Sequence, residues 1–379
     1  MPATEPHSDH DVLILGAGLA GSCTAHLLAR SGLRVGLVDP HHDRYPRLFR
    51  AEKIEADQIA LLRRFGLFDL VLPRTRLIRE ILRVQGGRIR HRRKLEQYGI
   101  SYQDIVNPIR EALPAAVERI DGRATGLVAD ALRPQVQLDD GRALSARLVI
   151  VANGGGHDLQ KSLGLKKQTF QNELSMVFGF ELVRQDGRDF DDDAVTVRPE
   201  STADRVGYLT LFRMGEMLRA NFFTYWKATD AYTRALAKSP DEVLHQVLPG
   251  MERVIGDYRV RGRVEPFRID LYRYSDAARP GIVFLADAYQ SVCPTTGMGM
   301  SKVLTDVDVL CHHCVPHWMQ AGRVDEAMVE AFYAHPLKQD VDARALKHAL
   351  RGRRIATEDT LPARLRRAVR NWRWATGVA

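Results

Sequence analysis

Three glycines, Gly16, Gly18 and Gly21, follow an apolar run at 12–15 and open a helical pattern that continues to residue 31. In this G-x-G-x-x-G spacing the first glycine permits a tight turn, the second lets the backbone approach a pyrophosphate, and the third allows close helix–strand packing. The start of the helix adds amide groups and a positive dipole end. Asp39 ends the next apolar run, where it can accept hydrogen bonds from an adenosine ribose. These residues predict a βαβ unit that binds NAD or FAD.

A second group of residues distinguishes between the two cofactors. Asp287 ends an apolar run at 281–286 and is followed by a glycine-containing loop, made of Pro294, Gly297, Gly299 and Met300. The spacing resembles the second FAD motif of the group A FAD-dependent monooxygenases, the para-hydroxybenzoate hydroxylase-type family. The resemblance implies that Asp287 contacts the ribitol and that the loop starts a helix beside the isoalloxazine ring. Amides at such a helix start stabilise negative charge on the reduced ring.

The resemblance covers roughly residues 10–335 and extends to two arginines. Arg50 occupies the place of the family's arginine after the second strand. Arg110 occupies that of its Arg-x-x-Leu helix, which here follows Tyr102. The resemblance implies that both guanidinium groups approach the FAD; a surface salt bridge is the alternative for each.

The middle motif of that family, Ala-Asp-Gly-x-x-Ser-x-Val-Arg, is altered in this chain. Asn153, His157 and Gln160 replace its Asp, Ser and Arg. Because the change removes a carboxylate and a cation, it argues against direct use of NAD(P)H and favours reduced flavin from a partner reductase; either reductant stays open. No catalytic base can be named: the candidates are His157 and Gln290, which replaces the family's His in the second motif.

The resemblance implies an FAD-dependent oxidoreductase of secondary metabolism. It would hydroxylate an aromatic or polycyclic small molecule with dioxygen through a flavin C4a-hydroperoxide. Two alternatives stay open: an FAD-dependent dehydrogenase, reductase or cyclase acting on an apolar substrate, and a non-catalytic FAD-binding interaction protein. The Trp-x-Trp-x-Ile-Pro motif of halogenating relatives does not occur in the sequence, which argues against halogenation.

The four cysteines predict packing and no metal site. Cys311 and Cys314 have a spacing that suits zinc on a helix, but Cys23 and Cys293 are isolated and provide no second ligand pair. Cys293 directly precedes Pro294 and would lie near the flavin, so a redox role is the alternative to packing there. So few cysteines in 379 residues also argue against a disulfide scaffold and for a reducing cytoplasm.

The pattern of strands and helices expected to position these residues predicts an α/β fold. It combines a three-layer Rossmann-like FAD-binding domain, an inserted antiparallel β-sheet substrate domain and a helical C-terminus. We assign 10–75, 101–165 and 276–335 to the FAD-binding domain, 76–100 and 166–275 to the substrate domain, and 336–379 to a basic helical C-terminal segment.

Within these parts, periodicity predicts helices over 50–67 and 102–118, a hairpin over 78–94 that turns at Gly86 and Gly87, and helical texture over 229–255. Strands are predicted at 175–183, 194–199, 206–213 and 217–226. Half of their aromatic residues should line a substrate pocket, namely some of Phe178, Phe180, Tyr208, Phe212, Phe222, Phe223, Tyr225 and Trp226.

The net charge of +8 is concentrated near the end of the chain. Residues 338–373 hold eleven Lys and Arg against four Asp and Glu, so the other residues carry only +1. A nearly neutral body argues against nucleic-acid binding. The basic segment has three interpretations: a helix packed on the FAD domain, a membrane-surface helix, or a docking site for an acidic partner.

Two further observations bear on localisation. The polar residues 1–11 do not form a secretory signal, and no stretch approaches the roughly 18–20 apolar residues of a membrane span. We therefore expect a cytoplasmic protein, with membrane-peripheral contact as the alternative that the basic segment leaves open.

Overall fold

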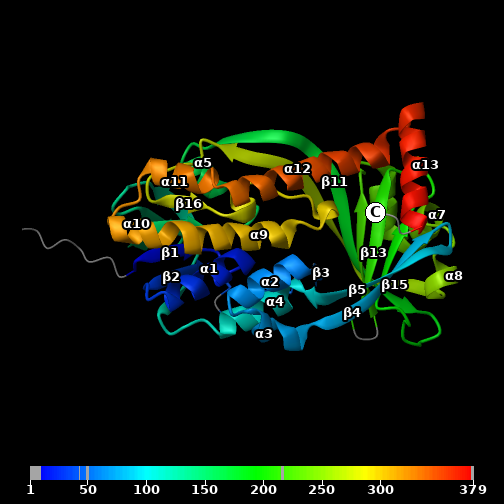
Figure 1. Ribbon diagram of the computed structural model, residues 1–379, viewed down its shortest axis with the longest axis horizontal. Helices are drawn as coiled ribbons and strands as arrows, with labels where there is room; N and C mark the ends of the chain where they lie inside the picture. Colours follow the sequence, from blue (N-terminus) through cyan, green and yellow to red (C-terminus); the bar gives the residue numbers. More distant parts are fainter. Residues whose placement is uncertain (1–9, 42, 48–50, 215–216, 377–379) are drawn as a thin grey trace, which may run out of the picture.

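The computed structural model describes residues 10–41, 43–47, 51–214 and 217–376. Its fold is α/β, with a parallel sheet toward one end of an elongated molecule and a large curled sheet toward the other (Figure 1). The parallel sheet has the order β16-β10-β1-β2-β6. Its strands are β1 (Val12–Leu15), β2 (Val35–Asp39), β6 (Val117–Asp121), β10 (Leu148–Val151) and β16 (Ile282–Phe284). The expected fold class is confirmed.

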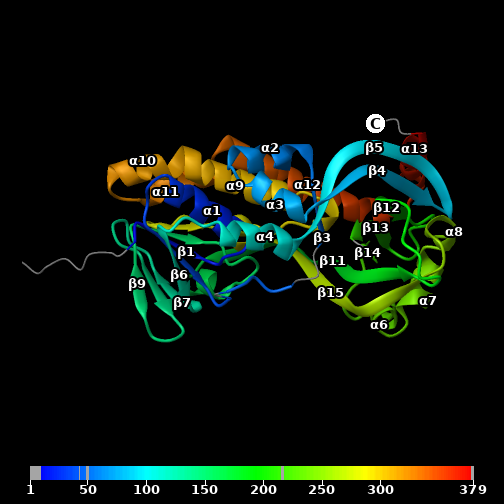
Figure 2. The same ribbon diagram turned by 90° about the horizontal axis from the view of Figure 1, so that it is seen from below.

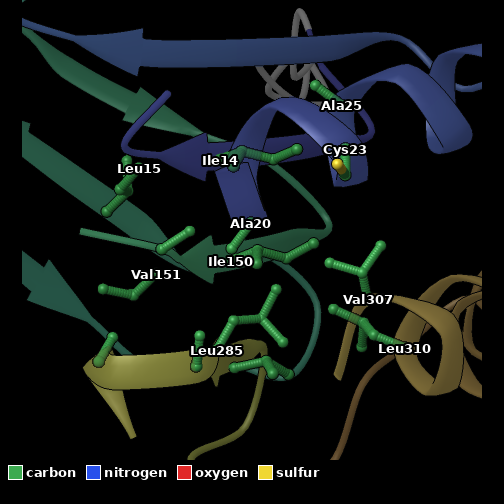
Figure 3. Packing of buried hydrophobic residues seen from close by; sticks show 14 of the residues in the cluster. Ile14, Leu15, Ala20, Cys23, Ala25, Ile150, Val151, Leu285, Val307 and Leu310 are labelled. Carbon is green, nitrogen blue, oxygen red and sulfur yellow. The ribbon is translucent and has the colours of Figure 1, made fainter. Parts of the chain in front are cut away.

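The parallel sheet is the middle of three layers. One face carries α1 (Leu19–Arg30), α4 (Tyr102–Glu111) and α9 (Gly299–Asp308); the other faces a small antiparallel sheet of β7 (Ala124–Val128), β8 (Gln135–Leu138) and β9 (Ala143–Ser145) (Figure 2). Figure 3 shows the core: Ile14 and Ile150 of the central strands contact the layer formed by Cys23 and Leu310. The strands are short apolar runs because both faces of a parallel sheet are buried.

The large sheet has the order β15-β11-β14-β13-β12-β4-β5-β3. Its strands are β3 (Ala51–Ile54), β4 (Arg76–Gln85), β5 (Arg88–Ser101), β11 (Lys166–Arg184), β12 (Ala194–Arg198), β13 (Val206–Met214), β14 (Met217–Thr224) and β15 (Tyr258–Ser275). Helices α6 (Ala231–Lys238), α7 (Pro240–Val247) and α8 (Glu252–Ile255) contribute to the core on one face. The hairpin over 78–94 and the strands predicted at 175–226 are confirmed, whereas β15 and the strands β6 to β9 were not predicted. The domain boundaries stay a prediction.

Two predicted helices have other bounds in the structure. The chain at Ala51–Ile54 pairs with β5 as a strand, and α2 (Ala56–Arg64) begins only after Glu55, which forms a capping box with Gln58. The helix predicted over 102–118 ends at Glu111, because 117–121 pairs in parallel with β2. Both errors arise from tertiary strand pairing that local periodicity does not reveal.

Short helices and the C-terminal helices complete the structure. They are α3 (Phe68–Val71), α5 (Asp158–Ser162), α10 (Val315–Ala321), α11 (Glu326–Tyr333), α12 (Pro336–Thr357) and α13 (Leu361–Thr376). Cys311 and Cys314 are buried in a π-helical turn at Val309–Cys314, and no group of residues able to hold a metal occurs within the described ranges. No described helix has the length and apolar character needed to cross a membrane.

Candidate active site

The first glycine turn connects β1 to α1 and is closely packed. Gly16 has a φ of 106°, and a Cβ there would lie 2.7 Å from the carbonyl oxygen of Ala152. A Cβ on Gly21 would lie 1.8 Å from the carbonyl oxygen of Gly16. A Cβ on Gly18 would point toward the hydroxyl of Tyr102, at 3.2 Å. The first and third glycines are therefore required for packing. The second has no side chain, so another group can approach the backbone closely at this position.

The start of α1 has no side-chain cap and no acidic residue in its first turn. The Leu19 amide donates to the Tyr102 hydroxyl at 3.1 Å, and the Ala17 amide donates to Oδ2 of Asp39 at 2.7 Å. These two acceptors lie outside the helix, and the start of α1 carries no cap or acidic side chain of its own, so its positive dipole end suits an anionic ligand.

Asp39 and Arg110 lie together at the carboxyl end of β2. Nη1 of Arg110 is 3.9 Å from Oδ1 of Asp39, and the guanidinium also donates to the carbonyl of His41. Burial lowers the pKa of Arg110, and the neighbouring carboxylate of Asp39 opposes that shift. Arg50 lies outside the described residues. The structure therefore brings one of the two predicted arginines to the expected ribose-binding end of the sheet.

The second turn follows β16 and leads into α9. Asp287 lies in a short 3₁₀ turn (Ala286–Ala288), and the 3₁₀ turn Pro294–Thr296 precedes α9, whose start also lacks a side-chain cap. A cavity of about 250 Å³ opens against this turn. From the predicted set its lining includes Asp287, Pro294, Gly297, Gly299 and Met300.

The opposite wall of this cavity, which we call the active cavity, is one face of the large sheet. It is apolar and aromatic, with Val177, Tyr208, Phe212, Phe223, Phe267 and Ile269. The Tyr208 hydroxyl donates to the carbonyl of Thr295 at 2.7 Å, and burial raises the pKa of Tyr208. Phe178, Phe180, Phe222 and Trp226 instead pack with the core beneath α6 and α7. Three of the eight predicted aromatic residues, Tyr208, Phe212 and Phe223, therefore line the active cavity, and Tyr225 does not.

Sequence reasoning missed several lining residues. Phe267 and Ile269 alternate in β15, a period-two pattern that could have identified the strand. Lys53 reaches the cavity from β3, which the sequence had placed in a helix. Thr210 and Asn221 add the polar groups of the sheet wall, and no motif marks them.

The two candidate catalytic residues lie elsewhere. Nδ1 of His157 is 2.8 Å from the Tyr274 hydroxyl, and burial and the Lys167 ammonium lower the pKa of this histidine. The buried Gln290 side chain donates to the carbonyl of Asp342 in α12 at 3.1 Å. Neither residue belongs to the described lining of the active cavity.

The altered middle motif has a structural role. The buried Gln160 amide donates to the carbonyl of Ala288 at 2.8 Å, so it joins α5 to the turn that carries Asp287. Oδ1 of Asn153 is buried beside the first glycine turn and has no hydrogen-bond partner among the described residues. A bound polar group would satisfy that acceptor.

These features fit FAD. Asp39 would hold the adenosine ribose, the start of α1 the pyrophosphate, Asp287 the ribitol, and the start of α9 the isoalloxazine ring beside the active cavity. The fold and this site define an FAD-binding α/β protein.

The chain belongs to the family described as FAD binding domain, whose family model it matches over residues 9–323. It is 27% identical to the ubiquinone hydroxylase of Rhodospirillum rubrum, across 80% of this chain and 72% of that relative. It is 26% identical to the aklavinone 12-hydroxylase of Streptomyces peucetius, across 81% of this chain and 67% of that relative. The crystal structure of p-nitrophenol 4-monooxygenase from Pseudomonas putida has a TM-score of 0.77 at 17% identity, covering 96% of this chain and 93% of that one, which shows the shared fold. The expected family is confirmed.

Proposed function

We propose that this monooxygenase hydroxylates an aromatic or polycyclic small molecule with dioxygen. The observation that carries the proposal is the active cavity, in which an aromatic sheet face lies opposite Asp287 and the start of α9. The names of the two sequence relatives, hydroxylases of ubiquinone and aklavinone, support a polycyclic or quinone-like ring system.

FAD, when bound and reduced, supplies the chemistry that activates dioxygen. The protein's own groups bind and orient. Phe212, Phe223 and Phe267 exclude water and hold a planar ring, and the amides at the start of α9 stabilise negative charge next to them. Tyr208 lies in the same wall, and its hydroxyl donates a hydrogen bond to the carbonyl of Thr295, so it is not a free general acid.

We propose that a partner reductase supplies the reduced flavin, because Asn153 and Gln160 replace the charged pair of the family motif. The experiment supplies the FAD-loaded protein with NADPH, NADH or chemically reduced flavin, a hydroxynaphthoquinone, and ¹⁸O₂. We expect one ¹⁸O atom in the product with reduced flavin, and slow bleaching of the bound flavin by either nucleotide. Turnover without incorporation of ¹⁸O would favour the dehydrogenase alternative. Rapid bleaching of the bound flavin by NADPH would overturn the proposal that a partner reductase supplies the reduced flavin.

We further propose a cytoplasmic protein whose α13 contacts an anionic membrane surface. Leu361, Leu365 and Trp372 are 74%, 70% and 61% exposed, and at about 100° per residue they lie on one stripe of the helix. Arg364 and Arg366 flank the stripe on either side. An apolar stripe between basic side chains is typical of helices that lie in a bilayer interface.

A further inference from the structure

A second cavity, of about 310 Å³, lies behind Tyr208 and beneath α12. Tyr208 lines both cavities, while Pro294 lines the active cavity and Thr295 the second one. The wall between the two cavities is therefore the Tyr208 ring together with the 294–295 segment.

The second cavity differs in chemistry from the active cavity. It is lined by the guanidinium groups of Arg198 and Arg351 and the side chains of Thr202 and Tyr225, with Glu200 as its acidic residue. Burial lowers the pKa of Arg198, but a guanidinium remains charged at neutral pH. Two cations against one anion, with hydroxyl donors beside them, suit an organic anion.

The dividing wall has an irregular backbone next to Tyr208. A register shift between Val206 and Tyr208 leaves Gly207 unpaired as a bulge in β13. A Cβ on Gly207 would lie 3.1 Å from the carbonyl of Phe223, so the bulge is tightly packed while the side chain after it is re-aimed. Tyr208 is held in place by the hydrogen bond from its hydroxyl to Thr295.

The second cavity lies next to a groove between the C-terminal helices. Arg351 and Ile355 line it and at the same time line a groove of about 640 Å³ between α12 and α13. On α12, Gly352 leaves room for this arrangement, because a Cβ there would lie 2.8 Å from the Tyr225 hydroxyl. Groove, second cavity and active cavity thus form a row in which neighbours share lining residues.

We propose that the second cavity is an access chamber that binds aromatic anions, with a carboxylate or phenolate paired to Arg198 and Arg351, before they pass Tyr208 to the active cavity. The inference rests on the proposed function and narrows its substrate class to ionised aromatic molecules. An ionised phenol is also the electron-rich form of the ring that hydroxylation requires.

The binding test uses two probes of the same shape and different charge, 1-hydroxy-2-naphthoate and 1-hydroxy-2-naphthamide. Calorimetric titration of the FAD-loaded protein gives the dissociation constants for wild type, Arg198→Gln and Arg351→Gln. We expect each substitution to weaken the naphthoate by about tenfold and the amide by less than about twofold. Arg263→Gln, which changes an exposed arginine of β15 outside both cavities, is the matched control.

Equal losses for both probes, or no loss for the naphthoate with either variant, overturn the access chamber. Arg351→Gln removes a surface-side arginine of α12, so it keeps the test decisive where Arg198→Gln does not fold. If ¹⁸O is incorporated but neither arginine substitution changes the dissociation constant of the naphthoate, the access chamber is refuted and the proposed function stands. Arginine-dependent binding without oxygen incorporation refutes the function alone.

The gate is tested by kinetics. Tyr208→Phe removes the hydrogen bond to Thr295 and leaves the ring, so the rate at which naphthoate perturbs the bound FAD spectrum should rise about threefold to tenfold. The dissociation constant should change by less than about threefold, because the ring remains. Tyr232→Phe, which removes a hydroxyl bonded to Asp204 away from the active cavity, is the control. An unchanged association rate in Tyr208→Phe overturns the gate.

Discussion

Helices α12 and α13 are consecutive and similarly basic, yet α12 has charged side chains buried in the protein whereas those described on α13 are exposed. Lys338 of α12 is fully buried, with its ammonium 2.9 Å from Asp306 of α9 and 3.2 Å from Asp342. Lys302 of α9 completes the group, 2.7 Å from Asp342. On α13, by contrast, Leu365 and the arginines beside it are exposed.

The difference shows that local charge does not decide burial. α12 lies against α9, which supplies the acidic partner Asp306, and the four buried charges cancel. The described ion pairs of α13 are instead exposed: Arg364 pairs with Asp359, and Arg366 with Glu358. The packing interpretation of the basic segment therefore applies to α12, while the apolar stripe of α13 is exposed.

The largest effect should come from breaking the buried charge group. Lys338→Met leaves two carboxylates with one lysine and should lower the free energy of unfolding of the FAD-loaded protein by about 3–5 kcal/mol. Denaturant titration measures it. Arg344→Met, which breaks the exposed pair with Asp340, is the control and should change stability by less than about 1 kcal/mol. Similar losses in both would contradict the contrast between buried and exposed charge.

A change on α13 should affect binding and leave stability alone. The double variant Leu365→Ser/Trp372→Ser should reduce binding to vesicles of mixed neutral and anionic phospholipid by at least about tenfold, because two apolar side chains no longer enter the interface. Co-sedimentation measures the effect. Leu132→Ser, equally exposed outside α13, is the control. If the wild-type protein does not bind the anionic vesicles, membrane contact is refuted.

Acid should weaken the contribution of the buried charge group at α12 to stability. It should leave vesicle binding by α13 unchanged. Burial alone would raise the pKa of Asp306, but the ammonium groups of Lys302 and Lys338 outweigh it and hold that pKa below its usual range. A depressed pKa contributes stability above the ordinary carboxyl value of about 4, and this is lost as pH falls through the depressed value. The stability difference between wild type and Asp306→Asn should therefore shrink on acidification, as unfolding at a series of pH values would show. A constant difference would contradict it. Vesicle binding should persist, because arginine stays charged.

The smallest effect concerns the turn beside this charge group. Ala286 has a φ of 52°, and its amide donates to Oδ2 of Asp306 at 2.9 Å. Ala286→Gly should relieve the left-handed backbone strain and raise the free energy of unfolding by about 1 kcal/mol. Ala288→Gly, in the same turn without positive φ, should lower it. Thermal unfolding measures the stability of both variants. A loss of stability in both would show that the turn is not strained.

Much of the fold was predictable because its signals are local. The first glycine motif, the buried strands at 12–15 and 148–151, and the hairpin at Gly86 and Gly87 each follow from neighbouring residues. The strand at Ala51–Ile54 and the end of α4 at Glu111 could not be predicted, since both depend on pairing with distant strands. The candidate site divides in the same way: its glycine turns were predicted, and the sheet wall from β15 was not.

The sequence by itself indicated the cofactor class, because its signals lie in short segments: the first glycine motif with Asp39 predicted NAD or FAD, and the resemblance of the segment around Asp287 to a second FAD motif favoured FAD. Tertiary structure alone decided which aromatic side chains line the active cavity. It also placed His157 and Gln290 outside the active cavity, and it made one helix of the basic segment pack against α9 while the other stays exposed. Those outcomes depend on which elements pack together, and burial and charge pairing across distant segments leave no trace in local sequence.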